Sequence, residues 1–321
     1  MYKIEHKPFG KLKELRLINA STGEWVSIIP GLAATINGLM LKAGDKKYEL
    51  INGCSTYEEL ITEGKRVFKG TKLFPFPNRI NKGQYGFEGK KYQLDINFPS
   101  EGNAIHGLVC ESSFDIVNEI ANENEASVEL QYNYDGSNNA YPFKYKLNIL
   151  YSLSEKGFAC KTTVENTDNK ELPMGDGWHP YFKLDGKVND LFVKIPSTQI
   201  VLVNDKMIPN GLTSESDQFT QSTKIGENQF DTCYKLEEKE GKQQVELVNE
   251  KEKVQLAVWQ ETGKNKYNYV QIYTPASRDC IAVEPMTCMP DAFNNKNGLI
   301  VLKPKEILNL AFGVELTIKI F

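Results

Sequence analysis

Residues 143–169 read FKYKLNILYSLSEKGFACKTTVENTDN, and apolar side chains recur there at every second position. In the first half, Tyr145, Leu147 and Ile149 are separated by the polar residues Lys146 and Asn148, and the second half repeats the pattern from Phe158. A period of two places all the apolar side chains on one face of an extended strand. Because each half ends in Ser, Asp or Asn, which are turn formers, the stretch predicts two β-strands.

The same period extends over most of the chain. It recurs in VELQYNYDGS (128–137), QVELVNEKEKVQLAVWQ (244–260), YVQIYTP (269–275), CIAVEP (280–285) and LNLAFGVELTIKIF (308–321). The segment YGFEGKKYQLDIN, residues 85–97, predicts a hairpin whose tight turn is Glu88-Gly89. The one good helical candidate is STYEELITE, which begins at Ser55 with Ser55 or Thr56 as N-cap. No internal repeat or linker interrupts the pattern, so residues 1–321 are predicted to form a single all-β unit, a large antiparallel β-sandwich.

The composition excludes several classes of protein. The net charge is −4 with a pI near 5.7, so neither nucleic acid nor an anionic membrane surface is an expected partner. No stretch approaches 18 consecutive apolar residues, and the N-terminus lacks the apolar core of a secretory signal. Six cysteines occur without CxxC spacing, which favours reduced thiols in a cytoplasmic protein.

Only three histidines occur, and two of them have distinctive surroundings. His6 lies in a polar N-terminal strand and is interpreted as a surface residue. His106 lies in the Gly- and Asn-containing segment EGNAIHGL, and His179 lies in GDGWHPYF, where aromatic neighbours predict a stiff apolar wall. A single histidine is more often a structural hydrogen-bonding group than a catalyst, but both are candidates for acid–base chemistry.

Glu284 and Arg79 are further candidates. Glu284 follows the apolar run CIAV, so it is predicted at or near the end of a strand. Pro285, which has no N–H, is expected to break the ladder there, so that the strand opens into a loop. Partial burial there would raise the pKa of the carboxyl towards the range of a general base, whereas the alternative is a surface glutamate. Arg79, in FPFPNRINKG, is one of only four arginines. Its guanidinium could bind two sugar oxygens as a fork, or it could instead staple the loop to a neighbouring carboxylate.

Asp231, in QFDTCY, is a binding candidate whose alternative role is a turn or capping aspartate. His106, His179, Asp231 and Glu284 are all possible metal ligands, but the chain lacks HxH, HExxH and paired cysteines. It also lacks a GxSxG elbow, a GxGxxG motif and a P-loop. We therefore expect neither a metal nor another cofactor.

Taken together in chain order, these segments resemble the aldose 1-epimerases, also called galactose mutarotases. The resemblance rests on five motifs between about residues 70 and 300, together with the hairpin at 85–97. The motifs are Asn78-Arg79-Ile80, Asn103-Ala104-Ile105-His106-Gly107, His179-Pro180-Tyr181-Phe182, Phe230-Asp231, and Glu284-Pro285 with Pro290-Asp291-Ala292-Phe293-Asn294. The segment GWHPYF and the pair Pro285-Met286 differ from the NHxYF and Glu-Thr-Gln patterns of the best-known galactose mutarotases, and therefore resemble a divergent branch.

The resemblance implies a galactose mutarotase-like supersandwich with one domain over residues 1–321. It implies Glu284 as general base and His179 as general acid, with Asn78, Arg79, His106 and Asp231 binding the sugar. The implied reaction interconverts the α and β anomers of a free hexose or related aldose through a ring-opened intermediate. The substrate would be a small-molecule sugar, and the protein a monomer or homodimer.

Three alternatives stay open at this stage. A carbohydrate-binding protein on the same fold would bind sugar without catalysis. A hexose phosphate epimerase would need a cluster of basic side chains, for which four arginines leave little material. A glycosidase needs two carboxylates across the scissile bond, whereas here the motif carboxylate is paired with a histidine.

Overall fold

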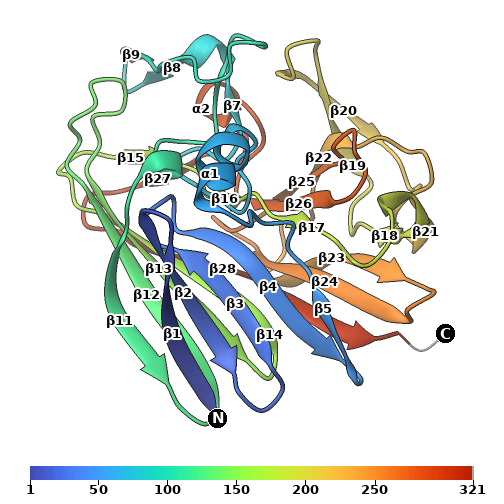
Figure 1. The fold of residues 1–321 in the computed structure, drawn as a ribbon. Coiled ribbons are helices and arrows are strands. Elements are labelled where there is room, and N and C mark those ends of the chain that lie inside the picture. The colour runs from blue at the N-terminus through green and yellow to red at the C-terminus, as the bar shows by residue number, and fades with distance from the viewer. Residues whose placement is uncertain (320–321) are drawn as a thin grey trace.

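A computed structural model describes residues 1–319, and the predicted all-β architecture is confirmed (Figure 1). Strands dominate, helices are short, and every strand pairing between the named strands is antiparallel. Figure 1 shows the long strands stacked in layers, with the short helices and small ribbons gathered at one end of the molecule. No helix within residues 1–319 has the length and apolar character needed to cross a membrane.

The largest sheet has nine strands and contains the stretch from which the fold was predicted. Residues 143–169 supply two adjacent strands of ten residues each, joined in register with Leu147 opposite Val164. Along the first of these strands, buried and half-buried side chains alternate without exception, as a period of two requires. In spatial order the strands are β11 (Asp115–Ala121), β12 (Glu125–Tyr134), β13 (Tyr145–Ser154), β14 (Gly157–Asn166), β28 (Ile307–Ile318), β24 (Val254–Thr262), β23 (Gly241–Asn249), β18 (Phe192–Lys194) and β21 (Thr223–Lys224).

A five-stranded N-terminal meander covers part of this sheet. Its strands are β1 (Tyr2–Phe9), β2 (Leu12–Asn19), β3 (Glu24–Ile29), β4 (Thr35–Ala43) and β5 (Lys46–Glu49). Strand β4 contacts β28, β2 contacts β12 and β13, and Tyr151 donates a hydrogen bond to the carbonyl of Ala34 at 2.9 Å. The apolar faces of the two sheets form one continuous core, which is the sandwich arrangement.

An eight-stranded sheet carries most of the residues singled out above. Its path runs β20 (Pro209–Glu215), β19 (Gln199–Val203), β22 (Asp231–Lys235), β25 (Tyr269–Tyr273), β26 (Ile281–Met286), β16 (Gly177–Trp178) and β6 (Lys72–Leu73), and β17 (Tyr181–Phe182) also pairs with β26. Three two-stranded ribbons complete the strands: β7 (Arg79–Ile80) with β10 (Ala104–Ile105), β8 (Gln84–Phe87) with β9 (Lys90–Gln93), and β15 (Leu172–Met174) with β27 (Ile300–Leu302).

The predicted helix is present at the predicted place. Helix α1 (Tyr57–Glu59) continues into a π-helical turn η1 (Leu60–Gly64), and Thr56 is its N-cap. The hydroxyl of Thr56 accepts from the amide of Glu59, and the Glu59 carboxylate accepts from the amide of Ser55, one residue before the N-cap, in an arrangement that resembles a capping box. The remaining helical segments are α2 (Ala292–Asn295) and the 3₁₀ turns η2 (Asn81–Gly83), η3 (Val109–Glu111) and η4 (Val188–Asp190).

The structure refines two local predictions. The hairpin forms with Glu88 and Gly89 at its turn, but both residues have positive φ, and its second strand ends at Gln93 rather than at Asn97. Glu284 was predicted at or near the end of a strand, and it lies two residues before the end of β26. Pro285 was expected to break the ladder, and this is wrong, because β26 runs on to Met286 with Pro285 opposite Val270. The carboxylate therefore stands on the face of a continuous strand rather than in a loop.

Candidate active site

His179 and Glu284 lie opposite one another on neighbouring strands. His179 falls between β16 and β17, which both pair with β26, through Gly177 with Met286 and through Tyr181 with Ala282. Because the pairs on either side of His179 have the same register, His179 lies directly across from Glu284. His179 Nε2 and Glu284 Oε1 are 3.4 Å apart. Both side chains are almost completely buried.

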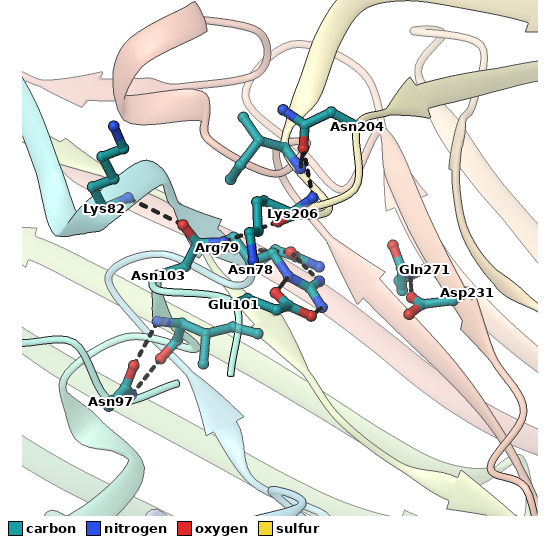
Figure 2. Close-up of polar contacts among 12 residues, drawn as sticks. Asn78, Arg79, Lys82, Asn97, Glu101, Asn103, Asn204, Lys206, Asp231 and Gln271 are labelled. Carbon is teal, nitrogen blue, oxygen red and sulfur yellow. Dashed lines mark hydrogen bonds and ion pairs between the residues drawn. The ribbon is translucent and has the colours of Figure 1, made fainter. Parts of the chain in front are cut away.

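Gln271 extends this row by one strand. It is the cross-strand partner of Glu284 in the pairing of β25 with β26. Direct partners in an antiparallel pair share one face, so His179, Glu284 and Gln271 project from the same side of the sheet. Asp231, on β22, lies diagonally beyond and accepts a hydrogen bond from Gln271 Nε2 at 2.7 Å (Figure 2). The strand register therefore brings four polar side chains together on one face of the sheet, those of His179, Glu284, Gln271 and Asp231.

Three polar atoms of this row are buried without a hydrogen-bond partner among residues 1–319. They are His179 Nδ1, Glu284 Oε2 and Gln271 Oε1. Buried polar groups are normally paired, and a group left unpaired costs about 1–3 kcal/mol. Their concentration beside one pocket is the pattern expected where a polar ligand supplies the missing partners.

Burial shifts the pKa values of the facing pair in opposite directions. It lowers the pKa of His179 to about 3 and raises the pKa of the Glu284 carboxyl well above its ordinary value. The negative charge of Asp231 adds to the shift at Glu284, whereas Arg79 opposes it. Burial thus disfavours the charged form of each group and favours an uncharged histidine beside a protonated carboxyl.

His106 reaches the pocket from the ribbon of β7 and β10, in which Ile105 lies opposite Arg79. Its backbone is left-handed, with φ 64, and the next residue, Gly107, has φ 82. A Cβ at Gly107 would lie 2.2 Å from the carbonyl oxygen of Phe74, so only glycine allows this close approach. The strained turn directs the His106 ring toward His179, with 5.1 Å between the ring centroids.

The hydrogen bonding of His106 determines which of its ring nitrogens is free. Nδ1 lies 2.7 Å from the carbonyl oxygen of Pro77, which can only accept, so Nδ1 carries the proton. Burial, reinforced by the neighbouring His179, lowers the pKa of His106 well below its ordinary value. The ring is therefore neutral, and its Nε2 is an acceptor for a ligand hydroxyl.

Arg79 is held by two neighbours (Figure 2). Glu101 accepts from Nε at 2.5 Å and from one terminal nitrogen at 2.8 Å, and the other terminal nitrogen donates to Asn78 Oδ1 at 3.2 Å. Arg79 therefore makes the contact expected from the second of its two predicted roles, in which it fixes a loop by pairing with a neighbouring carboxylate, here that of Glu101. Asp291 supports the same segment, because its amide donates to the carbonyl of Arg79 at 2.7 Å.

All six residues predicted from the sequence line a single pocket of about 310 Å³, a size typical of small-ligand sites. Asp231 as a whole residue is exposed, but its carboxyl lines the pocket, where desolvation raises its pKa; Arg79 opposes this shift and Glu101 adds to it. The lining comprises Arg66, Val67, Phe68, Asn78, Arg79, Phe98, Glu101, Ile105, His106, His179, Tyr181, Asp231, Gln271, Tyr273 and Glu284. Within residues 1–319, no cluster of three or more His, Cys, Asp or Glu side chains is arranged to hold a metal ion.

The model of the family described as aldose 1-epimerase matches residues 18–314. The chain belongs to the aldose 1-epimerase family. This is a family of isomerases, and the resemblance inferred from the five motifs is confirmed. Among relatives, the uncharacterised protein YihR of Escherichia coli K12 is 30% identical over 76% of this chain and 78% of its own length. The aldose 1-epimerase of the same organism is 25% identical over 63% of this chain and 56% of its own length.

Solved structures of aldose 1-epimerase relatives share the fold. A galactose mutarotase-like protein from Clostridium acetobutylicum superposes with a TM-score of 0.86 at 19% identity, covering 98% of each chain. Galactose 1-epimerase from Lactobacillus acidophilus gives a TM-score of 0.81 at 19% identity, covering 100% of this chain and 99% of that one. At these identities the likeness shows the fold.

Two pocket residues with polar contacts to predicted site residues, Gln271 and Glu101, were missed in the sequence of this aldose 1-epimerase family member. Gln271 is a polar residue inside the apolar run YVQIY, and that interruption was the available signal. Glu101 gave no local signal, because the loop PSEGN reads as an ordinary exposed turn. Its contact with Arg79 depends on how residues 97–105 fold back over the pocket.

Proposed function

We propose that this chain catalyses the interconversion of the α and β anomers of a free aldose, with Glu284 and His179 as the acid–base pair. The observation that carries the proposal is their 3.4 Å contact in a buried pocket, where each residue keeps one unpartnered polar atom. Membership of the aldose 1-epimerase family supports the reaction class.

The reaction matches what two adjacent groups can do. The anomeric hydroxyl and the ring oxygen are both bonded to C1, so side chains in contact with each other can reach both oxygens. Glu284 takes the proton of the anomeric hydroxyl, the bond from C1 to the ring oxygen breaks, and His179 protonates that oxygen. Rotation about the C1–C2 bond and the reverse transfers then close the ring on the other face, each well-placed group contributing roughly 10²–10⁴-fold.

The shared proton makes this assignment chemically consistent. Burial raises the pKa of Glu284 and lowers that of His179, so it favours the arrangement in which the shared proton lies on the Glu284 carboxyl. The catalytic form, a carboxylate beside an imidazolium, contains the same number of protons and is reached by transfer across the 3.4 Å contact. Bound sugar hydroxyls would favour this form by donating to the carboxylate.

The other polar groups have roles as sugar binders. Gln271 Oε1 and the free Nε2 of His106 accept hydrogen bonds from hydroxyls, and Asp231 accepts at the pocket mouth. Arg79 and Asn78 line the opposite part of the pocket. Because these groups bind substrate and transition state alike, they set affinity more than turnover.

A direct test is polarimetry of freshly dissolved α-anomers of glucose, galactose, xylose and arabinose, with and without the protein. We expect faster approach to anomeric equilibrium for at least one sugar. Binding of a sugar by calorimetry without any acceleration would instead support a carbohydrate-binding protein on this fold.

A further inference from the structure

Arg79 and Glu101 form an ion pair in the wall of the pocket, and the proposed acid–base chemistry does not require this pair. Glu101 occupies two of the three nitrogens of the Arg79 guanidinium, and the remaining nitrogen donates to Asn78 Oδ1. The two side chains are 9% and 19% exposed, so the pair is shielded from bulk water. Both residues line the pocket, so a bound sugar meets an already neutralised arginine rather than a free cation.

The loop that carries Glu101 is fixed at both ends (Figure 2). Asn97 bonds to both the amide and the carbonyl of Ile105, at 2.7 and 2.8 Å. Asn103 accepts from the amide of Lys82 at 3.0 Å and donates to the carbonyl of Lys206 at 2.9 Å. The Glu101 carboxylate is therefore held in place by its own loop, and an incoming anion would have to displace a buried, bidentate partner.

The charged residues that line the pocket also disfavour an anionic ligand. Of the five ionisable residues that line it besides the histidines and tyrosines, three are acidic (Glu101, Asp231 and Glu284) and two are basic (Arg66 and Arg79). Arg66 is exposed, so its charge is screened by water, whereas Arg79 is neutralised by Glu101. The enclosed part of the pocket has no uncompensated cation.

From this geometry we infer that Glu101 is a specificity-determining residue, which makes the pocket accept uncharged aldoses and reject sugars that carry an anionic group. The inference rests on the proposed function for the class of ligand. A sugar carboxylate or phosphate beside Glu101 would face a desolvated like charge, and such a juxtaposition disfavours the wrong ligand strongly. The hydroxyls of a neutral sugar can instead donate to the carboxylate.

The test compares Glu101→Gln with the unaltered protein, using two ligand pairs that differ only at C6, where a hydroxymethyl group is replaced by a carboxylate. These are glucose with glucuronate and galactose with galacturonate, and the readout is the ratio of the two dissociation constants by calorimetry. We expect the unaltered protein to favour the neutral sugar of at least one pair. We expect Glu101→Gln to move that ratio towards the uronate by at least about tenfold, because it leaves the charge of Arg79 uncompensated.

Two further variants serve as controls. Glu101→Asp keeps the charge and should keep the preference for the neutral sugar. Glu111→Gln removes an exposed carboxylate that pairs with Lys65 outside the pocket, and it should leave the ratio unchanged. An unaltered protein that prefers uronates, or a ratio that Glu101→Gln does not move, overturns the inference. Binding without mutarotation would count against the proposed function alone, because the ratio of affinities does not depend on turnover.

Discussion

His179 Nε2 and Glu284 Oε1 lie 3.4 Å apart across adjacent antiparallel strands, and both side chains are buried. Burial lowers the pKa of the histidine and raises that of the glutamate, and at this distance the titrations of the two groups are coupled.

Glu284→Gln should lower kcat by at least about 100-fold and change sugar affinity only a few-fold. The amide keeps the shape of the side chain but cannot take a proton. Anomer exchange measured by polarimetry or NMR checks kcat, and calorimetry checks binding. Glu49→Gln, which removes an exposed carboxylate paired with Lys183, should behave like the unaltered protein. A loss smaller than about tenfold in a folded Glu284→Gln protein would remove Glu284 from the role of base.

Substitution of the two pocket histidines, His179 and His106, should affect different kinetic constants. His179→Asn should mainly lower kcat, because an acid acts on charge that develops in the transition state. His106→Asn should mainly raise KM, because an acceptor for a ligand hydroxyl contributes to substrate and transition state alike. Steady-state kinetics on the best sugar separates the two effects. If His106→Asn loses kcat and His179→Asn loses only affinity, the two roles must be exchanged.

Acid should destabilise the protein partly through His179. Its pKa is about 3 in the folded protein, against about 6.5 for an unfolded histidine. Between these values the unfolded chain binds a proton that the folded protein does not, so stability falls as pH drops from about 6.5 towards 3.

His179→Asn should reduce this loss between pH 7 and pH 4.5 by at least about 1 kcal/mol, since one pKa unit corresponds to about 1.4 kcal/mol. Urea denaturation at the two pH values measures it. His6→Asn, at a side chain that is 46% exposed, is the matched control and should leave the loss as it is. Equal losses in the His179 and His6 variants would contradict the assignment.

Lys72 and Asp176 form a fully buried ion pair, and Asp176 precedes His179 by three residues in the chain. Lys72 Nζ lies 2.6 Å from Asp176 Oδ2 and 2.8 Å from the hydroxyl of Thr162. Lys72→Met should destabilise the protein by about 3–5 kcal/mol, because it leaves the carboxylate buried without its partner.

Lys146→Met is the matched control for this pair. Lys146 and Glu165 are 38% and 31% exposed, and exposed pairs are worth at most about 1 kcal/mol. Chemical denaturation of both variants gives the comparison. A loss at Lys72 no larger than that at Lys146 would show that the buried pair is unimportant for stability.

Gly107 should be irreplaceable in the turn that carries His106. Gly107→Ala places a Cβ 2.2 Å from the Phe74 carbonyl oxygen at φ 82, and it should cost about 2 kcal/mol or more and weaken sugar binding. Gly102 has φ 76 but nothing within 4 Å of an added Cβ, so Gly102→Ala should cost only about 1 kcal/mol. Thermal unfolding and calorimetry compare them, and equal effects would refute the close-approach argument.

The local pattern was enough to predict most of the fold. A period of two over residues 143–169 specified β13 and β14, and the pair Glu88-Gly89 specified a tight turn, because both depend on neighbours along the chain. Residue type within distinctive loops was likewise enough to select His106, His179 and Arg79 as candidates. The expectation that Pro285 breaks the ladder after Glu284 failed, because β26 accommodates this proline opposite Val270 and ends at Met286.

The arrangement of the site was decided by the tertiary structure. Residues 179, 231, 271 and 284 are far apart in the chain, and only the register of β22, β25, β26 and the β16–β17 segment aligns them on one face. The contact between Arg79 and Glu101 likewise depends on a loop anchored by Asn97 and Asn103. Side-chain periodicity tells which face of a strand a residue occupies, but not which strand lies beside it. Strand order and register are set by packing of the whole core, and no local sequence pattern contains them.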